Sequence, residues 1–518
     1  MKHIFLLVIF IYSTFSMASQ TIVKAPFKYN QEIILNEIDT TKIQAFFKKY
    51  PKLRSFQNQV KQLYKKHVNY IWYDQNGISE FAYAFYTRIG QINEEGLHIN
   101  IPYQSELDQI FQYDPDPKIN LESELLMSSM YFFYTDKVFN GLTEENSTQT
   151  GWHLPREKTP YNAYLDTIIK NLEFKKEFNH DYFNQYYALK KALKKYIEIE
   201  KNGGWIQIKP DKGIKSLQEG DSSITVQQVR TRLFTEGYID LDSGNLLFDK
   251  TVLSGVIKYE NTQNRNFEHK ITPDLIKLLN VSVEDRIKTI SVNMERCRWI
   301  SPKINDAKEY IAVNIPSFRL FYFRDSKPYL ISKVIVGKEF NKTTVFSGKI
   351  SYIAFAPYWN VPNSIYQKEI LPKLKKNPDY LQSQNMEWHN GRIRQKPGPG
   401  NALGLVKFIF PNSNNIYLHD TPMKSLFKNE KRAYSHGCIR VEKAHELALT
   451  IMEKEAKWTP EKVNAAMHSG KESIYVLKET IPVYIAYFTA WADQNENIAF
   501  YNDIYNRDNN LARMLFSE

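Results

Sequence analysis

The hydrophobic residues of this chain change their period along the sequence, and this change limits the possible folds more than any other feature. Before residue 285, apolar side chains recur every three or four positions, which is typical of amphipathic helices. From Tyr310 onward they alternate with polar side chains, as in Ile311, Val313 and Ile315, and this predicts strands. We therefore predict a multidomain α+β protein, and 518 residues are enough for about three or four domains.

Residues 19–205 are predicted to form a helical scaffold domain. The segment 43–70 has a helical period, and Pro51 should divide it into two helices because proline removes a backbone donor. The other helical stretches lie at 124–139 and 164–196, and a Gly-Gly-Trp sequence at 203–205 ends the domain.

Residues 206–285 are predicted to form a small bundle of three helices. Gly237 ends the first helix, Asp249 caps the second, and Thr272 caps the third, which starts with a proline. The order of these elements resembles the peptidoglycan-binding domain, although the usual Phe-Gln at the end of the second helix is replaced by Tyr-Glu. A helical spacer that does not bind glycan is the alternative interpretation.

Residues 286–518 are predicted to form a mostly-β domain. Besides the strands after Tyr310 and a turn at 324–327, strands are expected at 349–355, 416–419, 484–489 and 498–501, and a helix at 442–455. The segment 363–400 is long, charged and contains several prolines. A connection of that length inside a β domain is usually functional, so we expect a capping insertion there.

The first 18 residues have the layout of a secretory signal peptide. Lys2 precedes an unbroken apolar run at 4–12, and small residues follow at 16–18. This predicts export to the periplasm, and an uncleaved N-terminal anchor is the alternative. We expect no membrane-spanning segment in the chain after cleavage, because no later apolar run is long enough.

The charge balance is basic, with 68 Lys+Arg against 57 Asp+Glu and a net charge of +11. The basic residues are spread along the chain, and an exported protein has little access to nucleic acid, so we expect no nucleic-acid partner. An anionic polymer of the cell envelope or a membrane surface suits this charge better. The sequence contains no GxxxxGK[ST] and no GxGxxG motif, and its two cysteines exclude a disulfide-rich scaffold.

Two short segments, 417–422 and 435–440, concentrate the residues that can carry chemistry. Cys438 is a candidate nucleophile, and a nearby imidazole could take its proton. His436 and His419 are both candidates for that base, and an extended backbone would place His436 on the same face as Cys438. Gly437 would expose backbone amides beside the sulfur.

Arg440 follows the thiol by two residues and suits a substrate carboxylate or carbonyl. Three other interpretations of the cysteine remain open. Cys438 could be an inert buried side chain, or it could form a disulfide with Cys297. It could also bind zinc together with His419, His436 and Asp420.

The Ser-His-Gly-Cys sequence at 435–438, with His419 upstream, resembles the active-site motif of the YkuD-type L,D-transpeptidase catalytic domain. The wider sequence is similar to the large Gram-negative L,D-transpeptidases of the YcbB kind, with scaffold, peptidoglycan-binding and catalytic domains in that order. The motifs that carry this similarity are Asn314-Ile315-Pro316, Val336-Gly337-Lys338, Tyr358-Trp359-Asn360-Val361-Pro362, Asn401-Ala402-Leu403-Gly404 and Lys407-Phe408-Ile409-Phe410-Pro411-Asn412.

The resemblance implies 3→3 cross-linking of peptidoglycan stem peptides through a thioester on Cys438, with release of D-Ala. It implies His419 as base, held by a backbone carbonyl, with His436 as a supporting group. The amides of Gly437 and Cys438 would hold the oxyanion. The donor stem would contact Arg440, Tyr417, Trp359 and Ser435.

The resemblance implies no metal or organic cofactor. It does imply that carbapenems acylate the cysteine. Two other enzymes could use the same cysteine: a hydrolase acting as L,D-carboxypeptidase or endopeptidase, and a ligase that joins a protein lysine to peptidoglycan. A wall-binding scaffold with an inert cysteine is the non-enzymatic alternative.

Overall fold

The computed structural model of the chain describes residues 37–74, 77–112, 119–156, 165, 182–213, 215–263, 268–493 and 497–516. The predicted signal peptide and most of the helical stretch predicted at 164–196 lie outside these residues. Across the described ranges, no helix combines the length and the apolar character that crossing a membrane requires.

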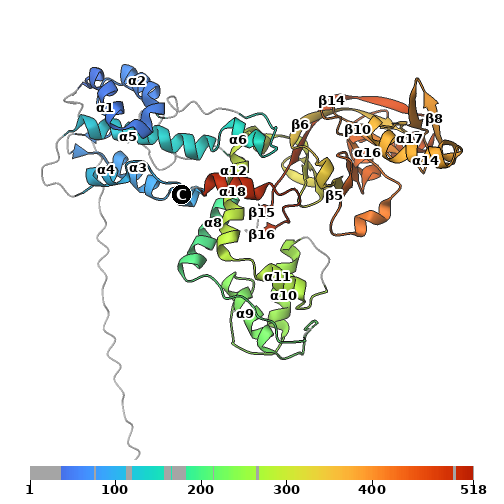
Figure 1. Cartoon of the computed structure of the whole chain (residues 1–518), viewed down its shortest axis with the longest axis horizontal. Coiled ribbons are helices and arrows are strands. Elements are labelled where there is room, and N and C mark those ends of the chain that lie inside the picture. Colours follow the sequence, from blue (N-terminus) through green and yellow to red (C-terminus); the bar gives the residue numbers. More distant parts are fainter. Residues whose placement is uncertain are drawn as a thin grey trace, which may run out of the picture.

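Helices and strands separate along the length of the molecule, as the change of period predicts (Figure 1). A helical region lies at one end, a small helical bundle hangs below the middle, and the β domain forms the other end. The α-helices of the first region are α1 (Ile43–Lys49), α2 (Gln57–Lys66), α3 (Glu80–Gly90), α4 (Gln104–Ile110), α5 (Leu121–Thr135), α6 (Glu144–Gln149) and α8 (Gln185–Lys201). A short hairpin, β1 (Tyr73–Asp74) and β2 (Gly77–Ile78), joins α2 to α3.

Pro51 separates α1 from α2, as predicted, and starts a 3₁₀ turn at Pro51–Phe56. The predicted helix at 124–139 is α5 followed by a π-helical turn at Asp136–Asn140. Almost every residue of α5 is buried, including Glu124, because the other helices surround it. Burial raises the pKa of Glu124 to about 7, and its carboxylate accepts from the Tyr64 hydroxyl at 2.6 Å.

The small bundle has a hydrophobic core of its own, formed by residues between Ile208 and Leu279. Its helices are α9 (Ile224–Thr235), α10 (Lys250–Gln263) and α11 (Pro273–Leu279). The predicted caps are present: Asp249 accepts from the backbone of Val252 at 3.0 Å, and Thr272 accepts from that of Leu275 at 3.2 Å. Gly237 follows the first helix with φ +79°.

Helix α12 (Val283–Arg298) was not predicted from the sequence, and it joins the three regions. It packs against α8 of the scaffold and against α18 (Asp508–Leu515) at the end of the chain. All but a few of its residues are buried, so its apolar side chains show no single face that could signal a helix. The predicted domain boundary between 285 and 286 falls inside this helix.

The β domain is built on one nine-stranded sheet in the order β12-β5-β13-β11-β10-β6-β14-β3-β4, and β4 also pairs with β5. Its strands are β3 (Glu309–Asn314), β4 (Arg319–Arg324), β5 (Lys327–Gly337), β6 (Phe346–Phe355), β10 (Val406–Ile409), β11 (Leu418–His419), β12 (Ala433–Ser435), β13 (Ile439–Val441) and β14 (Ser473–Ala486). Asp325 and Ser326 form the predicted turn, both with positive φ, as two-residue hairpin turns require.

Helices α16 (Ala444–Met452) and α17 (Pro460–His468) follow the site strands. The insertion at 363–400 leaves the sheet after β6 and forms a small unit beyond it. It comprises α13 (Asn363–Ile365), a π-helical turn (Tyr366–Ile370), α14 (Leu371–Lys376), α15 (Tyr380–Ser383), β8 (Met386–His389) and β9 (Arg392–Gln395), with β7 (Trp359–Asn360) paired to β9. Val361, Ile370 and Ile393 form its own core.

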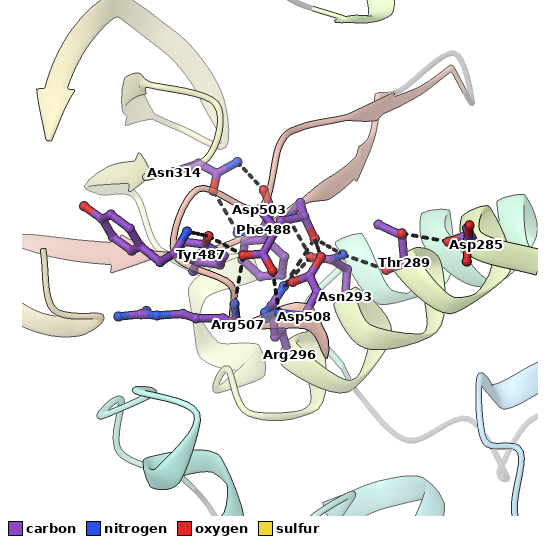
Figure 2. Close-up of polar contacts among 12 residues, drawn as sticks. Asp285, Thr289, Asn293, Arg296, Asn314, Tyr487, Phe488, Asp503, Arg507 and Asp508 are labelled. Carbon is purple, nitrogen blue, oxygen red and sulfur yellow. Dashed lines mark hydrogen bonds and ion pairs between the residues drawn. The ribbon is translucent and has the colours of Figure 1, made fainter. Parts of the chain in front are cut away.

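The end of the chain returns to α12 through β15 (Ala490–Ala492), β16 (Ile498–Phe500) and α18 (Figure 2). Arg296 of α12 pairs with Asp508 at 2.7 Å, and Asn293 donates to the Thr489 hydroxyl at 2.8 Å. The Thr489 hydroxyl in turn donates to Asp508 at 2.7 Å. These buried polar contacts fix the end of the chain against the helix that joins the domains.

Candidate active site

Three neighbouring strands bring the predicted site residues to one face of the sheet. β10 pairs with β11 so that Lys407 lies opposite His419, and β11 pairs with β13 so that His419 lies opposite Arg440. Directly opposed residues point their side chains to the same face. Tyr417 and Cys438 come two residues before His419 and Arg440, and the period of two returns them to that face. We call these five residues the site face.

Cys438 is a free, half-buried thiol immediately before β13. Its Sγ donates to the carbonyl oxygen of Asn415 at 3.6 Å, and Tyr417 lies beside the sulfur. Burial raises the pKa of the thiol, while the hydrogen bonds from Tyr417 and the charges of Lys407 and Arg440 oppose that rise. The resting sulfur is therefore protonated and needs a base.

His419 is buried, and the backbone holds its ring. Nδ1–H donates to the carbonyl oxygen of Asp420 at 2.5 Å, in agreement with the orientation implied by the resemblance. Burial, together with the charges of Arg440 and Lys407, lowers the pKa of His419 to about 3. Because Nδ1 donates to a carbonyl, the neutral ring is held as the tautomer whose lone pair is on Nε2.

The extended backbone expected at His436 does not form, because the chain bends at 436–438. Gly437 lies between His436 and Cys438 with φ +118°, which breaks the alternation of side chains. His436 Nε2 lies instead 2.8 Å from Glu369 Oε1 of the capping insertion. In the described part of the chain neither His419 nor His436 hydrogen-bonds the Cys438 sulfur, and such pairs often close only when substrate binds.

Hydrogen bonds hold the loop around Gly437. The buried Ser435 hydroxyl accepts from the Gly437 amide at 3.1 Å and donates to the Cys438 carbonyl at 2.5 Å. These hydrogen bonds indicate that Ser435 holds the loop in place, whereas the sequence analysis expected it to contact the substrate. The Gly437 amide is thus occupied, whereas the Cys438 amide donates to no acceptor among the residues described. Only one of the two expected oxyanion donors is available in this state.

The carbonyl of Gly437 is tied to the end of the chain. Thr343 Oγ1 donates to it at 2.9 Å, and the Thr343 amide donates to the Tyr505 hydroxyl at 3.2 Å. The Tyr505 hydroxyl donates to the carbonyl of Gly337 at 2.5 Å. The backbone N–H of Tyr505 donates to the Tyr487 hydroxyl at 2.9 Å. Tyr487 belongs to the polar cluster at α12 (Figure 2), so hydrogen bonds connect that cluster to the loop before Cys438.

The remaining predicted substrate contacts are distributed over the sheet and the insertion. Arg440 lies on the site face, with Nη1 3.6 Å from the sulfur of Met423. Tyr417 also lies there, in contact with Cys438. Trp359 lies on β7 and packs against the core of the capping insertion.

Lys407 is a site residue that the sequence analysis missed. Its Nζ lies 3.8 Å from the centroid of the Tyr417 ring. Val406 and Phe408 on either side of it are buried on the other face, so the alternation of β10 turns the lysine toward the site. A lysine in the middle of a core strand is unusual, and that signal could have identified it.

The alternatives left open by the sequence can now be compared with the geometry. Cys297 and Cys438 are both free, so the disulfide interpretation is wrong. Cys297 is fully buried on α12, and burial raises the pKa of its thiol. In the ranges that the structure covers, no group of three or more His, Cys, Asp and Glu side chains could hold a metal ion.

The site therefore combines a partly accessible thiol, a neutral imidazole with one fixed tautomer, a free backbone amide and two cations on one face. This set of groups can form and resolve an acyl-thioester.

Comparison with known families specifies the class of protein. A model of the L,D-transpeptidase catalytic domain, YkuD, matches residues 308–464, and a model of a scaffold domain matches residues 58–193. The chain thus carries a scaffold domain followed by a YkuD L,D-transpeptidase catalytic domain. All five site-face residues lie within the match to the YkuD catalytic domain at 308–464.

A putative L,D-transpeptidase of Haemophilus influenzae is 38% identical over 248 residues, which are 43% of this chain and 49% of that protein. The chain therefore matches about half the length of this curated relative. An L,D-transpeptidase structure from Stackebrandtia nassauensis aligns with 12% identity and a TM-score of 0.21, over 52% of this chain and 94% of that one. An L,D-transpeptidase structure from Xylanimonas cellulosilytica aligns with 11% identity and a TM-score of 0.17, over 54% of this chain and 100% of that one. Scores this low carry no argument about the arrangement of the whole chain.

Proposed function

We propose that this protein is an L,D-transpeptidase that forms 3→3 peptidoglycan cross-links through a thioester on Cys438. The observation that carries the proposal is the site face, where Cys438 lies with a neutral His419 inside a matched catalytic domain. The donor is a tetrapeptide stem whose third residue is a diamino acid. The acceptor is the side-chain amine of the same residue on a second stem.

In the first step the thiol proton passes to Nε2 of His419, and Sγ attacks the carbonyl carbon of the third stem residue. The Cys438 amide donates to the oxyanion that forms. The C–N bond to the terminal D-Ala then breaks, and the leaving amine takes the proton from His419. The product is a thioester on Cys438 and free D-Ala.

In the second step the acceptor amine attacks the thioester carbonyl and gives a proton to His419. The C–S bond breaks, the sulfur recovers that proton, and the new amide is the cross-link. No nucleotide is consumed, because the thioester conserves the energy of the peptide bond that was broken. Arg440 would bind a carboxylate of the donor stem, with Tyr417 alongside it.

The capping insertion at 363–400 would lie over the donor stem and exclude water, which favours the amine over hydrolysis. Its contact with the nucleophile loop, from Glu369 to His436, supports this role. Trp359 would then contact the donor from the cap.

We also propose that the chain acts in the periplasm after removal of residues 1–18. The scaffold domain, the peptidoglycan-binding-like bundle and the catalytic domain would together present the site to the cell wall. The separate core of the bundle supports treating it as a unit of its own.

Intact-mass analysis of the purified protein with disaccharide-tetrapeptide tests the proposal. We expect a covalent adduct that lacks D-Ala, and 3→3 dimers as the released product. Cys438→Ala should keep the fold and lose both, while Cys297→Ala, its buried counterpart, should keep both. An adduct that yields only tripeptide would favour the L,D-carboxypeptidase alternative. Dimer formation by Cys438→Ala would show that Cys438 is not the nucleophile.

Carbapenem acylation gives an independent measure of the nucleophile, because it needs no acceptor. His419→Ala should suppress acylation strongly, and His436→Ala should suppress it less, because His436 contacts the cap. The reverse order would contradict the assignment of the base. Transfer to a lysine-bearing peptide in place of a second stem would identify a protein ligase.

A further inference from the structure

Two cations on the site face have no carboxylate partner. Within the residues that the structure describes, neither Lys407 nor Arg440 forms a salt bridge. Both are half-buried, and burial lowers the pKa of each, while the charge of Cys438 opposes that change. Burying a cation without an anion is unfavourable, so this arrangement is suited to an anion that forms during the reaction.

Glu472 is the carboxylate whose charge acts on Lys407, and it is already hydrogen-bonded to the backbone. Glu472 influences Lys407 electrostatically, but its Oε1 accepts from the backbone N–H of Tyr358 at 3.0 Å. It therefore does not act as a direct ion-pair partner of the ammonium.

The strand register decides which side chains surround the sulfur. Lys407, on β10, lies opposite His419, and its ammonium packs over the ring of Tyr417 at 3.8 Å from the centroid. That same tyrosine lies beside Cys438, and the phenol and the thiol influence each other electrostatically. The ammonium, the ring and the sulfur thus follow one another across adjacent strands.

The usual counter-ion of a catalytic thiolate is a protonated histidine. His419 is a poor candidate here, because its pKa lies at about 3 and two positive charges face it. His436 is paired with Glu369. A positive charge beside the sulfur must therefore come from another residue.

We propose that the Lys407 ammonium is the counter-ion of the Cys438 thiolate. Arg440 remains available for the substrate carboxylate, so the two cations serve two different anions. In the resting state the ammonium adds to the burial and the Arg440 charge that lower the pKa of His419. This inference rests on the proposed function only in taking Cys438 as the nucleophile.

The pH dependence of Cys438 alkylation by iodoacetamide tests the inference without any peptidoglycan substrate. Lys407→Met removes the charge and keeps the length of the side chain. We expect its alkylation at pH 7 to be about tenfold slower, with the midpoint of the profile moved to higher pH and the limiting rate at high pH unchanged. Lys407→Arg keeps the charge and should restore most of the wild-type profile.

Two controls accompany this series. Lys288→Met removes an exposed lysine of α12, and should leave the profile unchanged. Peptide mapping assigns the label to Cys438, and Cys438→Ala gives the background. If Lys407→Met does not fold, Lys407→Gln provides the uncharged side chain.

An alkylation profile that does not move in a folded, uncharged variant would overturn the inference. If that variant instead shows only a raised KM for the donor stem, Lys407 binds a substrate carboxylate. The result is separable from the proposed function: wild-type protein that forms no 3→3 dimer would refute the function, while a shifted profile would still establish the counter-ion.

Discussion

His436 Nε2 lies 2.8 Å from Glu369 Oε1, and this contact joins the loop before Cys438 to the insertion at 363–400. Both side chains are partly exposed, so the ion pair contributes at most about 1 kcal/mol. Its position gives it more importance than its energy, because it links the loop before Cys438 to a segment about 70 residues earlier in the chain.

Glu369→Gln should loosen the cap and admit water to the thioester. We expect the ratio of 3→3 dimer to hydrolysed tripeptide to fall by about two- to fivefold, in line with the energy of an exposed ion pair. Chromatography of products from defined muropeptides measures this ratio. Glu387→Gln is the matched control, because Glu387 pairs with Arg394 inside the insertion and not with the loop. Equal effects of both changes would contradict a special role of Glu369.

Acid should destabilise the protein through His419. Its folded pKa of about 3 lies below the ordinary value of 6.5, so the unfolded chain binds this proton first as the pH falls. Stability from this group is complete above pH 6.5 and decreases below it, by about 1.4 kcal/mol per pH unit. Denaturant unfolding of wild-type protein and His419→Asn at pH 7.5 and pH 5 measures the difference. A gap between the two that is independent of pH would contradict the prediction.

Tyr505→Phe should weaken the support of the nucleophile loop. The change removes a buried hydroxyl that bonds Gly337 and Thr343, which should lower stability by about 1–3 kcal/mol. Carbapenem acylation, measured by mass under conditions where the variant is folded, should also slow. Thr343→Ser keeps the hydroxyl that holds Gly437 and should acylate normally, whereas Thr343→Val should not.

The control for this pair is Tyr475→Phe, which removes a hydroxyl bonded to Glu455, outside the chain of contacts that leads to the loop. It should leave acylation unchanged. A loss of stability in Tyr505→Phe without any change of acylation rate would make the tyrosine purely structural.

Gly437→Ala should lose acylation while largely keeping its fold. A Cβ at this position would meet nothing closer than the Asn341 carbonyl at 4.0 Å, so crowding is not the cause. The cause is φ +118°, which an L-amino acid rarely adopts, and relaxing it would move Cys438. Gly337→Ala differs, because its Cβ would lie 2.0 Å from the same carbonyl and should impair folding itself. Thermal unfolding together with acylation separates the two.

Local signals predicted the helical part of the fold where one face of each helix is buried. Pro51, Asp249 and Thr272 act where the sequence places them, because a cap or a break depends on the residue itself. Helix α12 was missed because several domains bury it on nearly all sides, which removes the periodic pattern. Long-range packing of that kind has no signature in a single segment.

The sequence alone predicted Cys438 as nucleophile with two candidate imidazoles, since a short motif carries a thiol and its possible bases together. The residues by themselves left both imidazoles open, and the family resemblance favoured His419. The φ of Gly437 and the contact of His436 with a distant insertion became visible only in the structure. Lys407 was also passed over, and it joins the site only through the pairing of β10 with β11. Chemistry is a property of residue types, but which residues meet is fixed by strand register and burial, and these form only when the whole chain folds.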